Sequence, residues 1–213
     1  MRRDRYATDG SNESIYQPGS RGRVLANRAG IVRVRDMQQA ESSALEALTL
    51  ALLDEVEMAQ CFTAADLCNW HRRWLGELYD WAGQYRQVNI GKGGFQFAAA
   101  HLLPRLMAGY ERESLALFTP CMDMDDERLA QALAVTHAEL VLVHPFRDGN
   151  GRLARLLNTL MALQAGLPTL DYGGIRGRNK RYYIGAIHAS LNRNYAPMER
   201  VFRSVIARTR RYA

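Results

Sequence analysis

The chain has 213 residues, of which 47% are hydrophobic and 23% are charged. This length and composition predict a globular protein with one sizeable core, and they argue against a disordered chain. No apolar run approaches the roughly 18 residues that a membrane span requires. The basic, polar start shows no apolar signal segment, so we expect a cytoplasmic protein, with delivery into another cell left open.

The net charge of +6 has two possible explanations. One is a nucleic-acid surface, and the other is a spread of arginines together with a pocket for an anionic ligand. Basic residues cluster only in RGRNKR (176–181) and in the tail RTRRY. The sequence contains no zinc finger and no aromatic-rich RNA-binding pattern, so direct nucleic-acid binding is the weaker explanation. Three cysteines without a CxxC pair favour reduced thiols over disulfides or zinc.

The first 83 residues predict a lead-in and two helices. Residues 1–30 contain glycine, proline, serine and asparagine, which predict a loose lead-in. Residues 35–59 predict a helix, and a second helix is predicted from about residue 64 to Gly83. The apolar stripes that support these two helices are Leu45, Leu48, Leu52 and Leu53, and then Leu67, Trp70, Trp74, Leu78 and Trp81.

The segment QYRQVNIGKGGFQFA (84–98) is the one convincing strand signal. Its apolar residues flank GKGG, whose glycines suit a tight turn, so we predict a short hairpin. The GKGG sequence is not a phosphate-binding P-loop, because that loop needs GxxxxGK[ST] after a strand. The apolar residues of the predicted hairpin are Val88, Ile90, Phe95 and Phe97.

The remainder of the chain predicts further helices. Pro104 suits a first turn, and the acids of DMDDE suit a helix start. We therefore predict an all-α protein, a helical bundle with one small β-hairpin, and a single domain over residues 31–213. The predicted helices cover about 104–118, 123–143, 151–165, 178–193 and 198–211.

The stretch HPFRDGNGRLAR (144–155) lies where one predicted helix ends and the next begins. The first N–H groups of a helix lack internal partners and favour an anion. Gly149 and Gly151 would let backbone amides approach a phosphate, and Asn150 would add an amide donor. Arg152 and Arg155 lie three residues apart, so both can reach one polyphosphate.

Two further residues supply chemistry. Asp148 beside a phosphate makes sense with a cation, and Mg²⁺ commonly binds through one carboxylate and phosphate oxygens. A neutral His144 can take a proton from an attacking hydroxyl. Each residue alone has an ordinary structural explanation, but together and in this order they indicate phosphoryl or nucleotidyl transfer. We expect Phe146 to point inward and anchor the loop.

The motif resembles the signature of the Fic family, HxFx(D/E)GNGRxxR, and every defined position matches. Three other stretches are similar to segments of that family. Together the similarity covers roughly residues 16–205. These stretches are YQPG…VLANRAGI, YDWAGQYRQVNIGKGGFQFA and RNYAPMERVF.

The resemblance implies a Fic-like fold and transfer of AMP from ATP to a hydroxyl of a target protein. It makes His144 the base and Asp148 the Mg²⁺ ligand, with the target docking along the flap hairpin, about 88–97. The residues it implies for nucleotide binding are Phe146, Arg147, Asp148, Gly149, Asn150, Gly151, Arg152 and Arg155, with Lys92 and Gly93 in the flap.

Several alternatives stay open. The transferred group can be UMP, phosphocholine or phosphate, the reaction can be removal of AMP, or the chain can be a nucleotide-sensing binding module. The inhibitory motif [S/T]xxxE[G/N] is not intact, because Ser42 and Glu46 are followed by Ala47. We therefore predict that a separate antitoxin chain inhibits the protein, or that no inhibition operates. His137 is expected to pack or support the site, and no partner is evident for His71.

Overall fold

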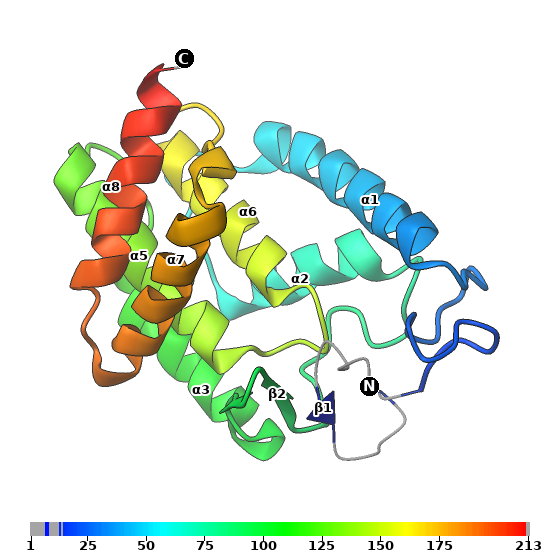
Figure 1. Cartoon of the computed structure of the whole chain (residues 1–213). Helices are drawn as coiled ribbons and strands as arrows, with labels where there is room; N and C mark the ends of the chain where they lie inside the picture. Colours follow the sequence, from blue (N-terminus) through cyan, green and yellow to red (C-terminus); the bar gives the residue numbers. More distant parts are fainter. Residues whose placement is uncertain (1–6, 9–12, 14, 212–213) are drawn as a thin grey trace. The chain divides into compact units, whose positions relative to one another are not determined.

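The computed structural model describes residues 7–8, 13 and 15–211. Its described residues are mostly helical with one hairpin, which confirms the predicted fold class (Figure 1). The chain forms two compact units. The first unit comprises Met1–Asp54, Ala64–Met107 and Val143–Asn150, and the second comprises Glu55–Thr63, Ala108–Leu142 and Gly151–Ala213. The single catalytic domain over 31–213 stays a prediction.

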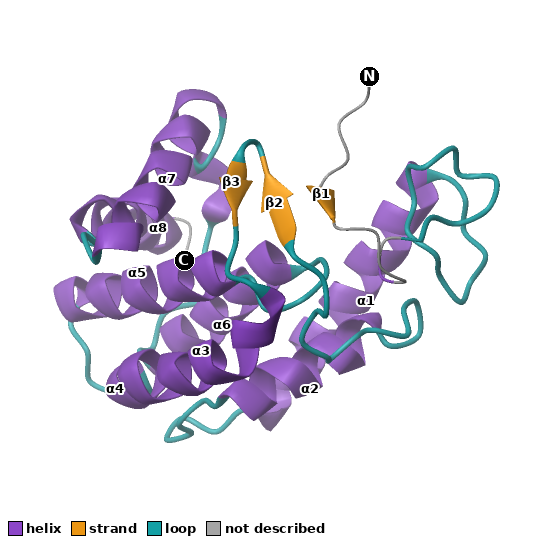
Figure 2. Cartoon of the chain, turned by 90° about the horizontal axis from the view of Figure 1, so that it is seen from below, coloured by secondary structure: helices purple, strands orange, loops and turns teal. Residues whose placement is uncertain are grey.

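The first unit contains a small antiparallel sheet in the order β1-β2-β3 (Figure 2). Strands β2 (Ile90–Lys92) and β3 (Phe95–Gln96) form the predicted hairpin. Its turn residues Gly93 and Gly94 have φ angles of 60° and 87°, which explains why glycines occupy both positions. Strand β1 (Ala7–Thr8) pairs with β2 on its other side. This third strand was not predicted, because it lies in the polar lead-in, of which residues 1–6, 9–12 and 14 are outside the described residues.

Helix α1 (Val34–Glu55) matches the first predicted helix but ends four residues earlier than residue 59. Leu48 and Leu52 are buried as expected, whereas Leu53 is 41% exposed. The prediction for Leu53 was therefore wrong. The buried face instead runs through Met37 and Glu41, and helical spacing places Leu53 beside rather than within that face.

Helix α2 (Ala64–Leu75) is shorter than predicted, because the chain leaves the helix at Gly76 rather than at Gly83. Glycine weakens a helix, and here the following residues form tight turns, with the N–H of Leu78 donating to the carbonyl of Leu75 at 2.9 Å. Gly83, with φ of 78°, ends the turns rather than the helix. The predicted stripe is nevertheless largely buried over Leu67, Trp70, Trp74 and Leu78, with Trp81 half-buried.

Helix α3 (Leu103–Tyr110) begins in the first unit and continues into the second through a π-helical turn (η3, Glu111–Leu115) and α4 (Ala116–Phe118). Together they correspond to the predicted helix 104–118. Helix α5 (Asp126–Val143) is buried over most of its circumference, as expected for a helix at the centre of a core. Helix α6 (Asn150–Gln164) begins at the last residue of the first unit.

Helices α7 (Gly177–Ala189) and α8 (Ala196–Arg211) complete the second unit and pack against each other (Figure 1). Helix α8 buries an apolar face at helical spacing, while arginines and Glu199 occupy its other side. Both helices were predicted within one or two residues, except that 190–192 form a 3₁₀ turn. None of the helices in the described ranges is long and apolar enough to cross a membrane.

Candidate active site

The motif begins with an unusual backbone. His144 directly follows α5 and has a φ of 52°, in the left-handed region that non-glycine residues seldom adopt. Its side chain is almost fully buried, at 5% exposure. The carbonyl of His144 accepts a hydrogen bond from Nε of Arg86 at 2.8 Å, and its ring stacks on Phe97 with 3.8 Å between centroids. The imidazole therefore has a defined position within the first unit.

Behind the loop lies a second histidine. His71 stacks on Phe146 with 4.0 Å between centroids and 9° between planes, and Phe146 is fully buried. This confirms that Phe146 points inward. The N–H of Gly83 donates to Nδ1 of His71 at 2.8 Å, so Nδ1 is the acceptor nitrogen of a neutral ring. Nε2 then carries the hydrogen and donates to the carbonyl of Asp148 at 3.1 Å.

Gly149 is required for two structural reasons. Its φ is 84°, and a Cβ at this position would lie 2.7 Å from Cζ3 of Trp74. Trp74 is 1% exposed, and its indole N–H donates to the carbonyl of Glu41 at 2.8 Å, so the ring cannot move aside easily. We expected this glycine to allow a phosphate to approach. The structure shows that it also fits the loop against the indole behind it.

Asn150 closes the loop with its side chain. Its Oδ1 accepts from the N–H of Phe146 at 2.8 Å, and its Nδ2 donates to the carbonyl of Phe146 at 2.7 Å. The side-chain amide that we expected as an anion donor is thus used within the loop. A contribution of Asn150 to anion binding would come from its backbone N–H, at the first residue of α6.

Asp148 is half-buried, and its Oδ1 accepts from the N–H of Gly149 at 2.6 Å. This contact orients the carboxylate at the entry to α6. Within the residues that the structure describes, no group of three or more histidine, cysteine, aspartate or glutamate side chains is arranged to hold a metal ion. Any metal at Asp148 would therefore take most of its ligands from elsewhere.

The rest of the motif belongs to the second unit. A Cβ at Gly151 would meet nothing within 4 Å, so this glycine is not required by packing. Arg152 and Arg155 are half-buried and three residues apart in α6. The guanidinium of Arg155 lies 5.2 Å from the centroid of the Tyr172 ring, within range of a cation–π contact.

His137 lies in a hydrogen-bonded network of the second unit. Its Nδ1 is 2.7 Å from Oδ1 of Asn158, and its Nε2 is 2.7 Å from the hydroxyl of Tyr183. Burial lowers the pKa of His137 to about 4, which leaves the ring neutral at physiological pH. The ring is fully buried, in agreement with the packing or supporting role that we expected.

Three further predicted residues belong to the first unit. Lys92 and Gly93 are exposed at the tip of the hairpin. Arg147 is 2% exposed, and its Nε donates to the backbone carbonyl of Glu13 at 2.9 Å. A carboxylate oxygen of Glu13 also accepts from the N–H of Gln87 at 3.0 Å. Arg147 thus holds the backbone of Glu13, and its role in nucleotide binding stays a prediction.

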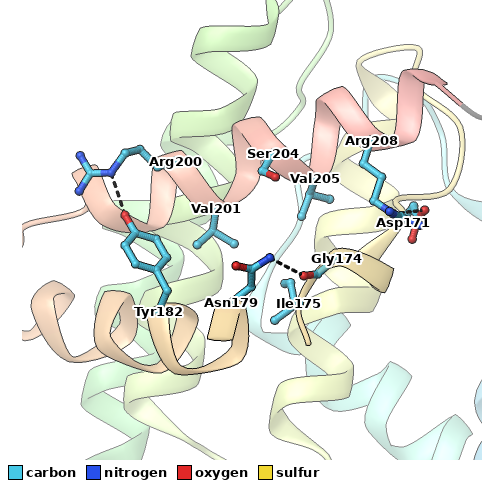
Figure 3. A pocket seen from close by; sticks show the side chains of 10 residues that line it. All are labelled: Asp171, Gly174, Ile175, Asn179, Tyr182, Arg200, Val201, Ser204, Val205 and Arg208. Atoms are coloured by element: carbon cyan, nitrogen blue, oxygen red, sulfur yellow. Dashed lines mark hydrogen bonds and ion pairs between the residues drawn. The ribbon is translucent and has the colours of Figure 1, made fainter. Parts of the chain in front are cut away.

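A cavity of about 210 Å³ opens in the second unit between α7 and α8 (Figure 3). Arg200 donates to the hydroxyl of Tyr182 at 2.7 Å on one side, and Arg208 donates to Asp171 at 2.6 Å on the other. None of the residues predicted for catalysis or nucleotide binding lines this cavity.

Comparison with known proteins identifies the family. The family model described as Fic/DOC matches residues 61–162. The probable protein adenylyltransferase Fic of Salmonella typhimurium is 32% identical over 158 residues, covering 71% of this chain and 74% of that protein. The chain belongs to the Fic/DOC family. The probable protein adenylyltransferase y4lH of Sinorhizobium fredii is 26% identical over 201 residues, 91% of this chain and 96% of that protein.

Solved Fic structures confirm the fold. The structure of BepC from Bartonella tribocorum, an effector with bound AMPPNP, aligns with a TM-score of 0.68 at 21% identity, covering 85% of this chain and 91% of that chain. The N-terminal Fic domain of an effector from Bartonella quintana with bound ADP aligns at 0.67 and 22% identity, covering 85% and 89%. These Fic domains therefore share the arrangement of helices and hairpin seen in this chain.

Reasoning from the sequence missed two residues of this Fic site. His71 was left without a partner, although it contacts Phe146 and Asp148. Arg86 was not singled out, although it is 1% exposed and contacts His144. Both lie more than 55 residues from the motif, so no local spacing relates them to it. The only signal was that Arg86 stands inside the segment that resembles the approach to the Fic flap.

Proposed function

We propose that this protein transfers AMP from ATP to a hydroxyl side chain of a target protein. The observation that carries the proposal is the intact motif, in which a positioned histidine is followed by a glycine turn that starts a 15-residue helix. The names of the two curated relatives, both probable protein adenylyltransferases, support the same reaction.

The triphosphate of ATP would bind at the beginning of α6. The first backbone N–H groups of a helix have no internal acceptor and carry partial positive charge, which suits phosphate oxygens. Gly151 presents no Cβ there, and the space beside it is open. Arg152 and Arg155 follow on one side of the same helix, where guanidinium groups would bind the outer phosphates.

Asp148 fits a Mg²⁺ ion that takes its remaining ligands from phosphate oxygens and water. Its carboxylate is already oriented by the N–H of Gly149, and the described residues provide no competing carboxylate cage. Mg²⁺ with one protein carboxylate plus substrate oxygens is a common arrangement in phosphate chemistry. When bound, the ion would neutralise part of the negative charge of the phosphates.

His144 would act as the general base. Its imidazole takes the proton of the target's serine, threonine or tyrosine hydroxyl, whose oxygen forms a bond to the α-phosphorus of ATP. The bond from the α-phosphorus to the bridging oxygen breaks, and pyrophosphate leaves with the electron pair. The products are a phosphodiester of AMP with the target and a protonated His144.

The target would dock along the hairpin, about 88–97, by pairing with its backbone, a mode in which main-chain bonds give affinity. Lys92 and Gly93 at the tip would then lie towards the nucleotide. Inhibition by a separate antitoxin chain and a cytoplasmic location are the remaining parts of this proposal. The first rests on the family resemblance and on the absence of an intact inhibitory motif in the sequence, and the second on three cysteines without a CxxC pair.

The test is incubation of the protein and candidate targets with ATP labelled at either the α- or the γ-phosphate. Label from the α-phosphate on protein supports AMP transfer, and label from the γ-phosphate points to phosphorylation. Binding of ATP without any transfer points to a nucleotide-sensing module. His144→Ala is the matched variant, which should abolish the α-label while keeping the unfolding temperature; an unchanged α-label would refute the role of His144.

A further inference from the structure

The guanidinium of Arg86 connects His144, the proposed base, to the residues on both sides of the hairpin. Arg86 is 1% exposed. Its Nε donates to the carbonyl of His144 at 2.8 Å, one terminal nitrogen donates to the carbonyl of Val88 at 2.6 Å, and the other to the carbonyl of Ala98 at 2.5 Å. Val88 precedes β2 and Ala98 follows β3, so the guanidinium spans both stems of the hairpin.

The backbone of Arg86 adds a fourth contact, because its N–H donates to the carbonyl of Pro145 at 2.9 Å. Two of these four bonds end on the consecutive carbonyls of His144 and Pro145. His144 has a φ of 52°, in the left-handed region that is unfavourable for a non-glycine residue and persists only where surrounding contacts impose it. The contacts from Arg86 flank this residue on its C-terminal side.

The side chain of His144 is held from the same hairpin. The Phe97 ring stacks on the imidazole at 3.8 Å with 19° between the planes. Phe97 is itself fixed, since its N–H donates to the carbonyl of Ile90 at 3.1 Å and its ring packs against Val88 and Ile90. Contacts from the hairpin therefore reach the backbone of His144 through Arg86 and the ring of His144 through Phe97.

We propose that Arg86 and Phe97 are positioning residues that set His144 relative to the hairpin on which a target strand would dock. This inference rests on the proposed function. A target strand paired to the hairpin would present its hydroxyl at a fixed position. The contacts from Arg86 and Phe97 hold the imidazole of His144 in a fixed position relative to the same hairpin. Misplacing a catalytic group by about 1 Å can cost on the order of a hundredfold in rate.

The test compares Phe97→Leu with Phe97→Tyr and Arg86→Lys. Leucine keeps apolar contact with Val88 and Ile90 but removes the stacked ring, whereas tyrosine keeps the ring. Lysine keeps the charge but cannot donate to three carbonyls from one planar group. We expect kcat for label transfer to fall roughly ten- to hundred-fold in Phe97→Leu and Arg86→Lys, with the dissociation constant for ATP unchanged, and to recover in Phe97→Tyr.

A second readout does not depend on activity. The stacked Phe97 ring should shift the ring-proton resonances of His144 upfield, and the signal can be assigned by its loss in His144→Ala. We expect this shift to disappear in Phe97→Leu, to persist in Phe97→Tyr and to change in Arg86→Lys. Tyr79→Phe is the stability control, because it removes the buried hydrogen bond to Glu41 of α1 at 2.7 Å.

The outcomes separate the two proposals. If the wild-type protein transfers no label, the proposed function fails, yet the resonances of His144 still report whether Arg86 and Phe97 position it. Unchanged resonances and unchanged kcat in Phe97→Leu would overturn the inference. A loss of kcat in Tyr79→Phe equal to that in Phe97→Leu would also overturn it, because general loosening would then explain the effect. If Arg86→Lys does not fold, the Phe97 variants decide.

Discussion

Alanine substitutions at Gly149 and Gly151 should have opposite effects on stability and activity. At Gly149, alanine must adopt a φ of 84°, which costs about 1–2 kcal/mol. Its Cβ would also lie 2.7 Å from Cζ3 of the buried Trp74, and such overpacking costs about 1–3 kcal/mol. The free energy of unfolding should therefore fall by roughly 2–5 kcal/mol in Gly149→Ala.

Gly151→Ala has neither problem, because a Cβ there meets nothing within 4 Å and the residue lies in α6. Alanine favours a helix over glycine, so this variant should be as stable as the wild type or about 0–1 kcal/mol more stable. Its methyl group would, however, stand where we place the phosphates. We therefore expect normal folding with a reduced affinity for ATP.

Urea unfolding measures the free energy of unfolding of both variants, and isothermal titration calorimetry with a non-hydrolysable ATP analogue measures their affinity for the nucleotide. A Gly149→Ala protein as stable as the wild type would show that the loop does not press on Trp74 as described. A Gly151→Ala protein that binds the analogue with unchanged affinity would show that no phosphate approaches the start of α6. The two variants thus distinguish the effect of packing at Gly149 from the effect on ATP binding at Gly151.

Three further predictions concern titration, thiol chemistry and metal dependence. Burial lowers the pKa of His137 to about 4, below its unfolded value of 6.5, so the unfolded state gains the proton first as pH falls. The free energy of unfolding should therefore decline between pH 6.5 and 4, by on the order of 3 kcal/mol in total. The urea midpoint should show this pH dependence in the wild type and in the control His101→Gln, which changes an exposed residue, but not in His137→Phe. Burial raises the pKa of Cys121 to about 12. Iodoacetamide should therefore modify the exposed Cys61 and leave Cys121 unmodified until the protein unfolds, as detected by mass spectrometry. Equal labelling of both cysteines in the folded protein would contradict this. Asp148→Asn should raise the Mg²⁺ concentration needed for half-maximal label transfer, and an unchanged titration curve would remove Asp148 from the metal site.

The sequence predicted the helices because they bury large, regular apolar faces, and it predicted the hairpin because GKGG needs positive φ angles. It failed where tertiary contacts decide. Helix α2 ends at Leu75, since the following turns are held by contacts such as that between Gly83 and the ring of His71, 12 residues apart. Leu53 belongs to an apolar cluster in sequence but not to the buried face of α1.

The candidate site was predicted to a similar extent. The motif supplied His144, Asp148 and the glycine turn because these residues are consecutive. It did not reveal that the side-chain amide of Asn150 bonds to the backbone of Phe146. It also could not reveal Arg86, because a buried arginine that donates to carbonyls from three separate segments leaves no periodic or local pattern.

The short strand Ala7–Thr8 changes which side of the sheet can grow. Gly91 in β2 is aligned with Ala7 on one side and with Gln96 on the other, so β2 is an interior strand within the described sheet. A foreign chain that extends this sheet must attach outside β3 or outside β1, unless β1 first detaches from β2. A segment whose composition suggested only a loose leader thus occupies the edge of β2 that would otherwise be open to an incoming chain.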